Sequence, residues 1–176
     1  LNVGAGAGLQ TPGYSKAGGD ASDPYSVSAP GGSLSLVSTR GDVVLGAGST
    51  VSVGGGAGAG GLLSVKAAKG SATFAGTIDA TTPDGGARFD LDTGGAFDLS
   101  GFVRSTKGGF DGGLTAKTGR GDLVLDEGLG LKARNVALVA DGGAVIVVGS
   151  IDASGINGGE IGLFVASPAT LGSKAV

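Results

Sequence analysis

The stretch Gly41-Asp42-Val43-Val44-Leu45-Gly46-Ala47-Gly48-Ser49-Thr50-Val51 decides the fold of this chain. It contains two short apolar runs, and the turn between them is rich in glycine and too short to hold a helix. Successive side chains of a β-strand point to opposite faces, so each run places its apolar residues on one face. The stretch therefore predicts two short strands joined by a tight corner.

The same pattern recurs along the chain at intervals of roughly 22 to 29 residues, which indicates a repeat architecture. Each repeat has a first run, a turn, a second run, a glycine and a third run. The first runs begin at Leu34, Leu63, Phe89, Leu114, Val136 and Ile161. The second runs supply the inward pairs Val43/Leu45, Ala72/Phe74, Phe97/Leu99, Leu123/Leu125 and Val145/Val147. The third runs centre on Val51, Ile78, Val103, Leu131 and Ile151, preceded by Gly48, Gly76, Gly101, Gly128 and Gly149.

Three short strands per repeat, with no room for a helix between them, predict an all-β fold, the parallel β-helix or β-solenoid. A single coil cannot bury its inward side chains, whereas a stack of coils shares one apolar column. We expect about five to six coils, spaced about 4.8 Å apart. Glycine, which adopts positive φ without strain, is expected at the corners.

Composition excludes several classes of function. The chain has 176 residues, of which 40 are glycine, and it contains no Cys and no His. It therefore has no thiol nucleophile, no His-based triad and no zinc finger. With a net charge of −3 and scattered Lys and Arg, it is not expected to bind nucleic acid. A mean hydropathy of +0.30 argues against disorder, and no apolar run is long enough for a membrane-spanning helix.

Both ends of the sequence fall inside patterned segments, and the first residue is not Met. We therefore interpret residues 1–176 as a single β-helical segment of a longer chain. The register also predicts columns of charge on the outside, in which opposite signs lie one coil apart. These columns are Lys66, Asp92 and Lys117 on the first sheet, and Asp79, Arg104, Lys132 and Asp152 on the third.

The least repetitive stretch, at about residues 10–30, is predicted to be a long loop. Loops of this length on a tightly turned fold are uncommon and are often functional. This loop holds both tyrosines of the chain, a residue type suited to contacts with sugars or proteins. Its alternative role is an insertion that packs over the first coil and shields its edge. The candidate ligand-binding residues are Tyr14, Lys16, Asp20, Asp23 and Tyr25.

The tripeptide Arg-Gly-Asp occurs twice, as Arg40-Gly41-Asp42 and Arg120-Gly121-Asp122. Both copies are candidate receptor-binding tripeptides. However, both fall at the same turn of the repeat, between the first and second runs, where Gly and Asp are favoured for backbone reasons alone. Turn chemistry is therefore the preferred interpretation.

Carboxylates are the remaining candidates for chemistry. Asp90 and Asp92 share one strand face, as the acid/base pair of a polysaccharide-degrading β-helix enzyme would require, but Lys residues flank Asp92 in its column. We expect no catalytic residue and no enzyme activity. No cofactor is expected, although Asp20, Asp23, Asp84 and Asp126 are candidate ligands of a calcium ion.

Several phrases of the sequence resemble the repeats of the filamentous haemagglutinin family. They include residues 41–51, 76–80, 138–143 and 145–155. The resemblance implies a right-handed β-helical shaft that is secreted or held at the bacterial cell surface. It also implies export of the parent chain by two-partner secretion through an outer-membrane transporter, and roles in adhesion, aggregation or biofilm formation.

Three functional hypotheses follow. The first is a structural shaft segment of a secreted surface adhesin. The second is a carbohydrate- or receptor-binding segment that uses the loop at 10–30 to hold an exopolysaccharide or a host or bacterial receptor. The third and least favoured is a polysaccharide-degrading enzyme. The uniform turns and short loops favour the first.

Overall fold

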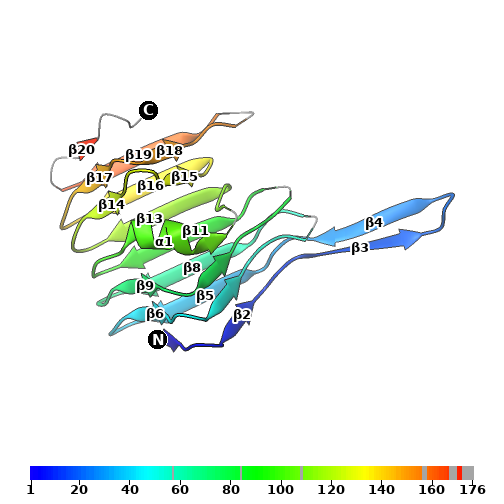
Figure 1. The fold of residues 1–176 in the computed structure, drawn as a ribbon, viewed down its shortest axis with the longest axis horizontal. Helices are drawn as coiled ribbons and strands as arrows, with labels where there is room; N and C mark the ends of the chain where they lie inside the picture. The colour runs from blue at the N-terminus through cyan, green and yellow to red at the C-terminus, as the bar shows by residue number, and fades with distance from the viewer. Residues whose placement is uncertain (57, 84, 108, 156–157, 167–169, 172–176) are drawn as a thin grey trace.

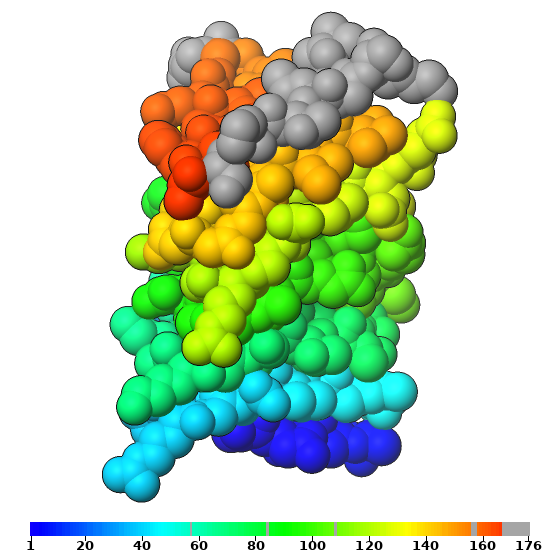
Figure 2. Space-filling model, turned by 90° about the vertical axis from the view of Figure 1, so that its left-hand side faces the viewer, coloured from blue at the N-terminus to red at the C-terminus, as the bar shows by residue number. Residues whose placement is uncertain are grey.

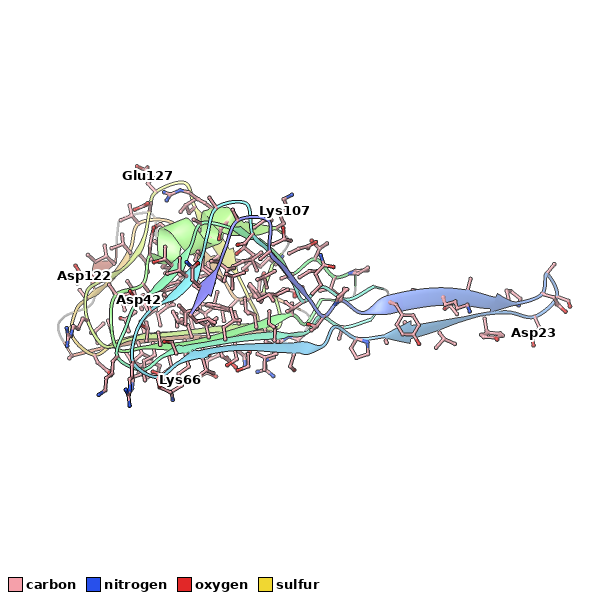
Figure 3. All side chains as sticks on the ribbon, turned by 90° about the horizontal axis from the view of Figure 1, so that it is seen from below. Asp23, Asp42, Lys66, Lys107, Asp122 and Glu127 are labelled. Carbon is pink, nitrogen blue, oxygen red and sulfur yellow. The ribbon has the colours of Figure 1, made fainter. Side chains whose placement is uncertain are left out.

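A computed structural model describes residues 1–56, 58–83, 85–107, 109–155, 158–166 and 170–171. The chain forms a parallel β-solenoid of about five turns, which confirms the predicted fold. The chain winds around the axis of the rod as a right-handed coil (Figure 1, Figure 3). Successive coils lie on one another in chain order (Figure 2).

The first face is one continuous six-stranded parallel sheet that runs through every coil from the second onward. Its residue pairs align Leu34, Leu63, Phe89, Leu114, Val136 and Ile161 in a single column, so the predicted register of the first runs is confirmed. Its strands are β5 (Ser33–Ser38), β8 (Leu62–Ala67), β11 (Arg88–Thr93), β13 (Gly113–Thr118), β16 (Asn135–Ala140) and β19 (Glu160–Val165).

The second and third faces are each split into two sheets at the fourth coil. The second face consists of β1 (Asn2–Val3), β6 (Val43–Leu45) and β9 (Ala72–Phe74), followed by β14 (Leu123–Leu125), β17 (Val145–Val147) and β20 (Thr170–Leu171). The third consists of β2 (Gly8–Gln10), β7 (Thr50–Ser52), β10 (Thr77–Asp79) and β12 (Thr106–Lys107), followed by β15 (Gly130–Lys132) and β18 (Ser150–Asp152).

The first coil was not predicted. Strand β1 pairs with β6, and β2 pairs with β7, so residues 1–10 form a coil that lacks only the first strand. The signal was present in the sequence, because residues 3–6 read Val-Gly-Ala-Gly and residues 45–48 read Leu-Gly-Ala-Gly.

The fourth coil departs from the prediction. Its second and third runs were expected as strands around Leu99 and Val103, but residues Leu99–Ser105 form the helix α1. The Asp98 side chain caps this helix by accepting a hydrogen bond from the Gly101 amide at 2.8 Å. Ile78 consequently pairs with Thr106 instead of Val103.

A cluster of aromatic rings accounts for the helix. By turning the chain, α1 places Phe102 in the interior, where its ring stacks on that of Phe89 with centroids 4.2 Å apart. Such pairs add to the free energy of burial. Five of the six phenylalanines of the chain are buried and meet in this cluster: Phe74, Phe89, Phe97, Phe102 and Phe110.

The inward residues of the three faces form the predicted apolar column. Val43, Leu45 and Val51 are fully buried, and their counterparts in the next coil, Ala72, Phe74 and Ile78, are buried as well. Ile161 takes the same inward position on β19 but is 45% exposed, because the described residues provide only one neighbour for that strand.

At most corners of the coil, glycine is required for a reason other than the predicted positive φ. Gly48 and Gly128 do adopt positive φ at their corners, and only eight glycines among the described residues do so. At Gly61, Gly70 and other corner positions, a Cβ would instead collide with the backbone of the neighbouring coil. Close stacking of coils therefore explains more of the glycine content than conformational freedom does.

The exterior charge columns are confirmed in part. Lys66 pairs with Asp92 at 3.1 Å and Lys132 with Asp152 at 3.8 Å. Lys117, however, pairs with Asp141 at 3.1 Å instead of Asp92. Arg104 leaves the third column because it lies on α1. All these side chains are about half exposed or more, so each pair contributes little to stability.

The segment predicted as a loop is instead an antiparallel hairpin. Strands β3 (Tyr14–Gly19) and β4 (Pro24–Ala29) pair along their whole length. The hairpin projects sideways from the rod and does not cover the first coil (Figure 1, Figure 3). The alternative role of shielding the edge of that coil is therefore wrong.

Candidate functional site

Backbone contacts with the rod fix the base of the hairpin. The Gly13 amide donates to the Gly54 carbonyl at 2.8 Å, and the Gly32 amide donates to the Thr11 carbonyl at 2.7 Å. The second bond joins the segment that enters the hairpin to the segment that leaves it. The hairpin is therefore a lateral extension of one corner, anchored at both of its ends.

An aspartate-centred turn forms the tip. Gly19 has a φ of +83°, which reverses the chain at the end of β3. The Asp20 side chain accepts hydrogen bonds from the Ser22 hydroxyl at 2.6 Å, the Ser22 amide at 2.8 Å and the Asp23 amide at 3.0 Å. These hydrogen bonds, those from Ser22 above all, lower the pKa of Asp20 below 3.8. Asp20 therefore holds the turn.

The two faces of the hairpin differ in chemistry. Cross-strand partners share a face, so the pairs Tyr14/Ala29, Lys16/Val27 and Gly18/Tyr25 form one side, which we call the tyrosine face. The pairs Ser15/Ser28, Ala17/Ser26 and Gly19/Pro24 form the other, which carries no aromatic or charged side chain.

The tyrosine face is exposed and hollowed. Tyr14, Tyr25 and Val27 are 56%, 59% and 49% exposed. A shallow cavity of about 260 Å³ lies on the hairpin, lined by Tyr14, Lys16, Ala17, Gly18, Tyr25 and Val27. The Tyr25 ring occupies the space above Gly18, where a Cβ would lie 2.7 Å from the ring. The absence of a side chain at Gly18 lets this ring lie against β3.

The predicted ligand-binding residues thus separate into two groups. Tyr14, Lys16 and Tyr25 come together on the tyrosine face. Asp20 and Asp23 lie at the tip, which is the point farthest from the rod (Figure 3). Val27 and Gly18 were not predicted, although their alternation with small residues in residues 14–29 is the signal that could have revealed them.

The two Arg-Gly-Asp turns have the same structural task. The Asp42 carboxylate accepts a hydrogen bond from the Ser71 amide, and the Asp122 carboxylate accepts one from the Ala144 amide, both at 2.8 Å. Each aspartate thereby caps the corner of the next coil. Both lie on the side of the rod away from the hairpin (Figure 3). The predicted turn role of these residues agrees with this geometry. Arg40 and Arg120 are exposed, and Gly121 has a φ of +78°.

The other carboxylates are dispersed. The described residues contain no group of three or more acidic side chains close enough to hold a metal ion. Asp126 pairs with Arg104 at 2.6 Å, and Asp92 pairs with Lys66. Asp84, a candidate calcium ligand, lies outside the described residues.

Within the described residues, no helix has the length and apolar character needed to cross a membrane. Comparison with protein-family models, curated proteins and solved structures gave no match for this chain. The fold itself therefore defines the class of protein: a parallel β-solenoid that carries a lateral hairpin.

Proposed function

We propose that this chain is a structural shaft segment of a secreted bacterial surface adhesin, with a role in adhesion, aggregation or biofilm formation. The observation that carries the proposal is the unbroken six-stranded sheet, which joins coil to coil in one register. A solenoid of this kind gains length by adding coils, each contributing about 4.8 Å. Its similarity in repeat style to the filamentous haemagglutinin family supports the same role.

The proposal includes a location and a route. The parent chain would leave the cell through an outer-membrane transporter of a two-partner system and remain at the cell surface. Antibodies raised against the purified chain test this location on intact, unpermeabilised cells of the source organism. Surface labelling, together with loss of cell aggregation or attachment on addition of Fab fragments, is the expected result. Labelling only after permeabilisation would overturn the proposal.

A second candidate function is recognition of a carbohydrate or a receptor by the hairpin. The specific observation in its favour is the exposure of Tyr14, Tyr25 and Val27 on one side of an element that leaves the rod. A variant lacking residues 14–29 tests this candidate, because Gly13 and Pro30 already lie next to each other at the base. If the hairpin is the recognition element, the variant stays folded but loses binding to cells or matrix.

A further inference from the structure

The class of ligand that the hairpin would bind can be inferred from its faces, because only one of them is suited to burial. Its two strands pack mainly on each other, and only the end next to the rod approaches it, where Tyr14 and Ala29 lie beside Gly56 and Gly58. An isolated two-stranded hairpin is marginally stable in water. Large side chains and the cavity occur on the tyrosine face, whereas the opposite face consists of Ser, Ala, Gly and Pro residues. The tyrosine face is therefore the side that a ligand would cover.

We propose that the tyrosine face binds an anionic polysaccharide laid along the hairpin. The rings of Tyr14 and Tyr25 would contact the apolar faces of sugar rings, and the Lys16 ammonium would pair with a carboxylate or sulfate. This assignment rests on the recognition role proposed for the hairpin and narrows its ligand class.

The size of the face favours a glycan over a folded protein. A stable protein–protein interface uses about 20–30 residues on each side. The tyrosine face has six residues, and its cavity is shallow at about 260 Å³. The rows that carry Tyr14 and Tyr25 are four residues apart along β3, which corresponds to about 13 Å. An extended chain of sugar rings can contact both tyrosines over this length without a larger footprint.

The charge of the face favours an anionic glycan. Lys16 is the only cationic residue between residues 11 and 39. It has no ion-pair partner within 4.0 Å among the residues that the structure describes. It sits in the central row, one row away from each tyrosine. The two carboxylates of the hairpin, Asp20 and Asp23, lie at its tip, where Asp20 accepts hydrogen bonds from Ser22 and from the Asp23 amide.

Preorganisation supports the same assignment. The Tyr25 ring rests over Gly18, and the cross-strand pairing already places both tyrosines on one face before a ligand binds. Binding therefore requires little ordering of the protein, which lowers the entropic cost of association.

Glycan binding by the whole chain tests the proposal. Biolayer interferometry would compare alginate, polygalacturonate, hyaluronan and heparin with neutral dextran and cellohexaose. We expect saturable binding to at least one anionic glycan, weakened by added salt, and none to the neutral ones. Y14A/Y25A should abolish binding, and K16Q should weaken it by about two- to fivefold, as expected for the loss of one exposed ion pair. K16R should keep most of the affinity.

The matched control is S15A/S26A, which alters the opposite face of the same hairpin and should change the affinity by less than twofold. Circular dichroism would verify that each variant is folded. Equal binding of neutral and anionic glycans, or binding unaffected by Y14A/Y25A, would overturn the proposal. So would a lack of binding to every anionic glycan. In that last case, attachment to cells that still depends on residues 14–29 would leave the recognition role intact and assign it to a protein or to a second copy of the chain.

Discussion

At the scale of single residues, close stacking of backbone on backbone decides where this protein needs glycine. Gly41 and Gly70 occupy the same corner in successive coils. A Cβ on Gly70 would collide with the backbone of Gly41, whereas a Cβ on Gly41 would meet nothing within 4 Å. Neither residue has a positive φ, so packing alone distinguishes them.

The pair gives a direct test. We expect Gly70→Ala to lower the free energy of unfolding by about 1–3 kcal/mol or more, because the neighbouring coil must move. Gly41→Ala should have an effect of about 0.5 kcal/mol or less, as is usual for surface sites. Urea denaturation of both variants measures the difference. Equal destabilisation would contradict the stacking explanation.

The Arg-Gly-Asp turns offer a second residue-scale prediction. Asp122→Ala removes the acceptor of the Ala144 amide, and we expect it to lower the free energy of unfolding by about 1 kcal/mol. Asp122→Asn keeps an acceptor oxygen and should have a smaller effect. Thermal unfolding distinguishes the two variants. A silent Asp122→Ala would argue against the capping role.

At the scale of elements, α1 is attached to the coil above it by the buried Ser100 hydroxyl and by the ion pair between Arg104 and Asp126. Ser100 is 4% exposed, donates to the Val124 carbonyl at 2.8 Å and accepts from the Asp126 amide at 2.9 Å. These bonds take the place of the strand pairing that α1 interrupts. The helix is therefore hydrogen-bonded into the stack of coils.

Ser100→Ala should leave the Val124 carbonyl and the Asp126 amide without this partner, and it should lower the free energy of unfolding by about 1–3 kcal/mol. Ser105→Ala is the matched control, because the Ser105 hydroxyl donates to the Phe102 carbonyl within the same helix and so does not join α1 to another coil in the described part of the chain. Chemical denaturation provides the measurement. A larger loss in the control than in Ser100→Ala would refute this account of the attachment.

The same attachment predicts a dependence on pH. The hydrogen bond from the Arg104 guanidinium lowers the pKa of Asp126 below its ordinary value of 3.8. A lowered folded-state pKa stabilises the fold above the unfolded-state value, and the effect disappears as pH falls through the folded-state pKa. Stability should therefore decline below about pH 4. Asp126→Asn and Arg104→Gln should each make this decline shallower in thermal melts between pH 2 and 6. An unchanged slope in both variants would contradict the prediction.

At the scale of the whole molecule, each coil behaves as an interchangeable layer. The Glu160 amide donates to the Arg134 carbonyl at 2.9 Å, so the two residues lie at the same corner one coil apart. Strand β19 repeats the register of β16, with Glu160 aligned to Asn135. Removing residues 135–159 would therefore place β19 where β16 now lies.

We expect this deletion, made in a chain that also lacks residues 14–29, to fold into a rod shorter by about 4.8 Å. Small-angle X-ray scattering measures the length, and circular dichroism verifies the fold. Deleting residues 135–158 instead is the control, because a shift of one residue turns every inward side chain of β19 outward. Folding of both deletions with equal stability would contradict the layered description.

Alternation of apolar residues over two positions is a local property, and the sequence alone therefore determined the solenoid and its register. Leu63, Phe89 and Leu114 can share one interior column in only one alignment, and that alignment is the observed one. Local alternation does not reveal the long-range contacts of α1. The helix depends on Phe102 meeting Phe89 and on Ser100 reaching the next coil. A strand pattern at Leu99 and Val103 carries no trace of either contact.

The candidate site divides in the same way. The break in the repeat singled out the segment around Tyr14 and Tyr25, because it is the least repetitive stretch of the sequence and holds both tyrosines of the chain. Only the tertiary structure showed that the segment is a hairpin, and that pairing places Tyr14, Lys16 and Tyr25 on one face while Asp20 is used in the turn. The physical reason is that cross-strand pairing joins residues distant in the sequence, and its register depends on the turn geometry at Gly19 and Asp20.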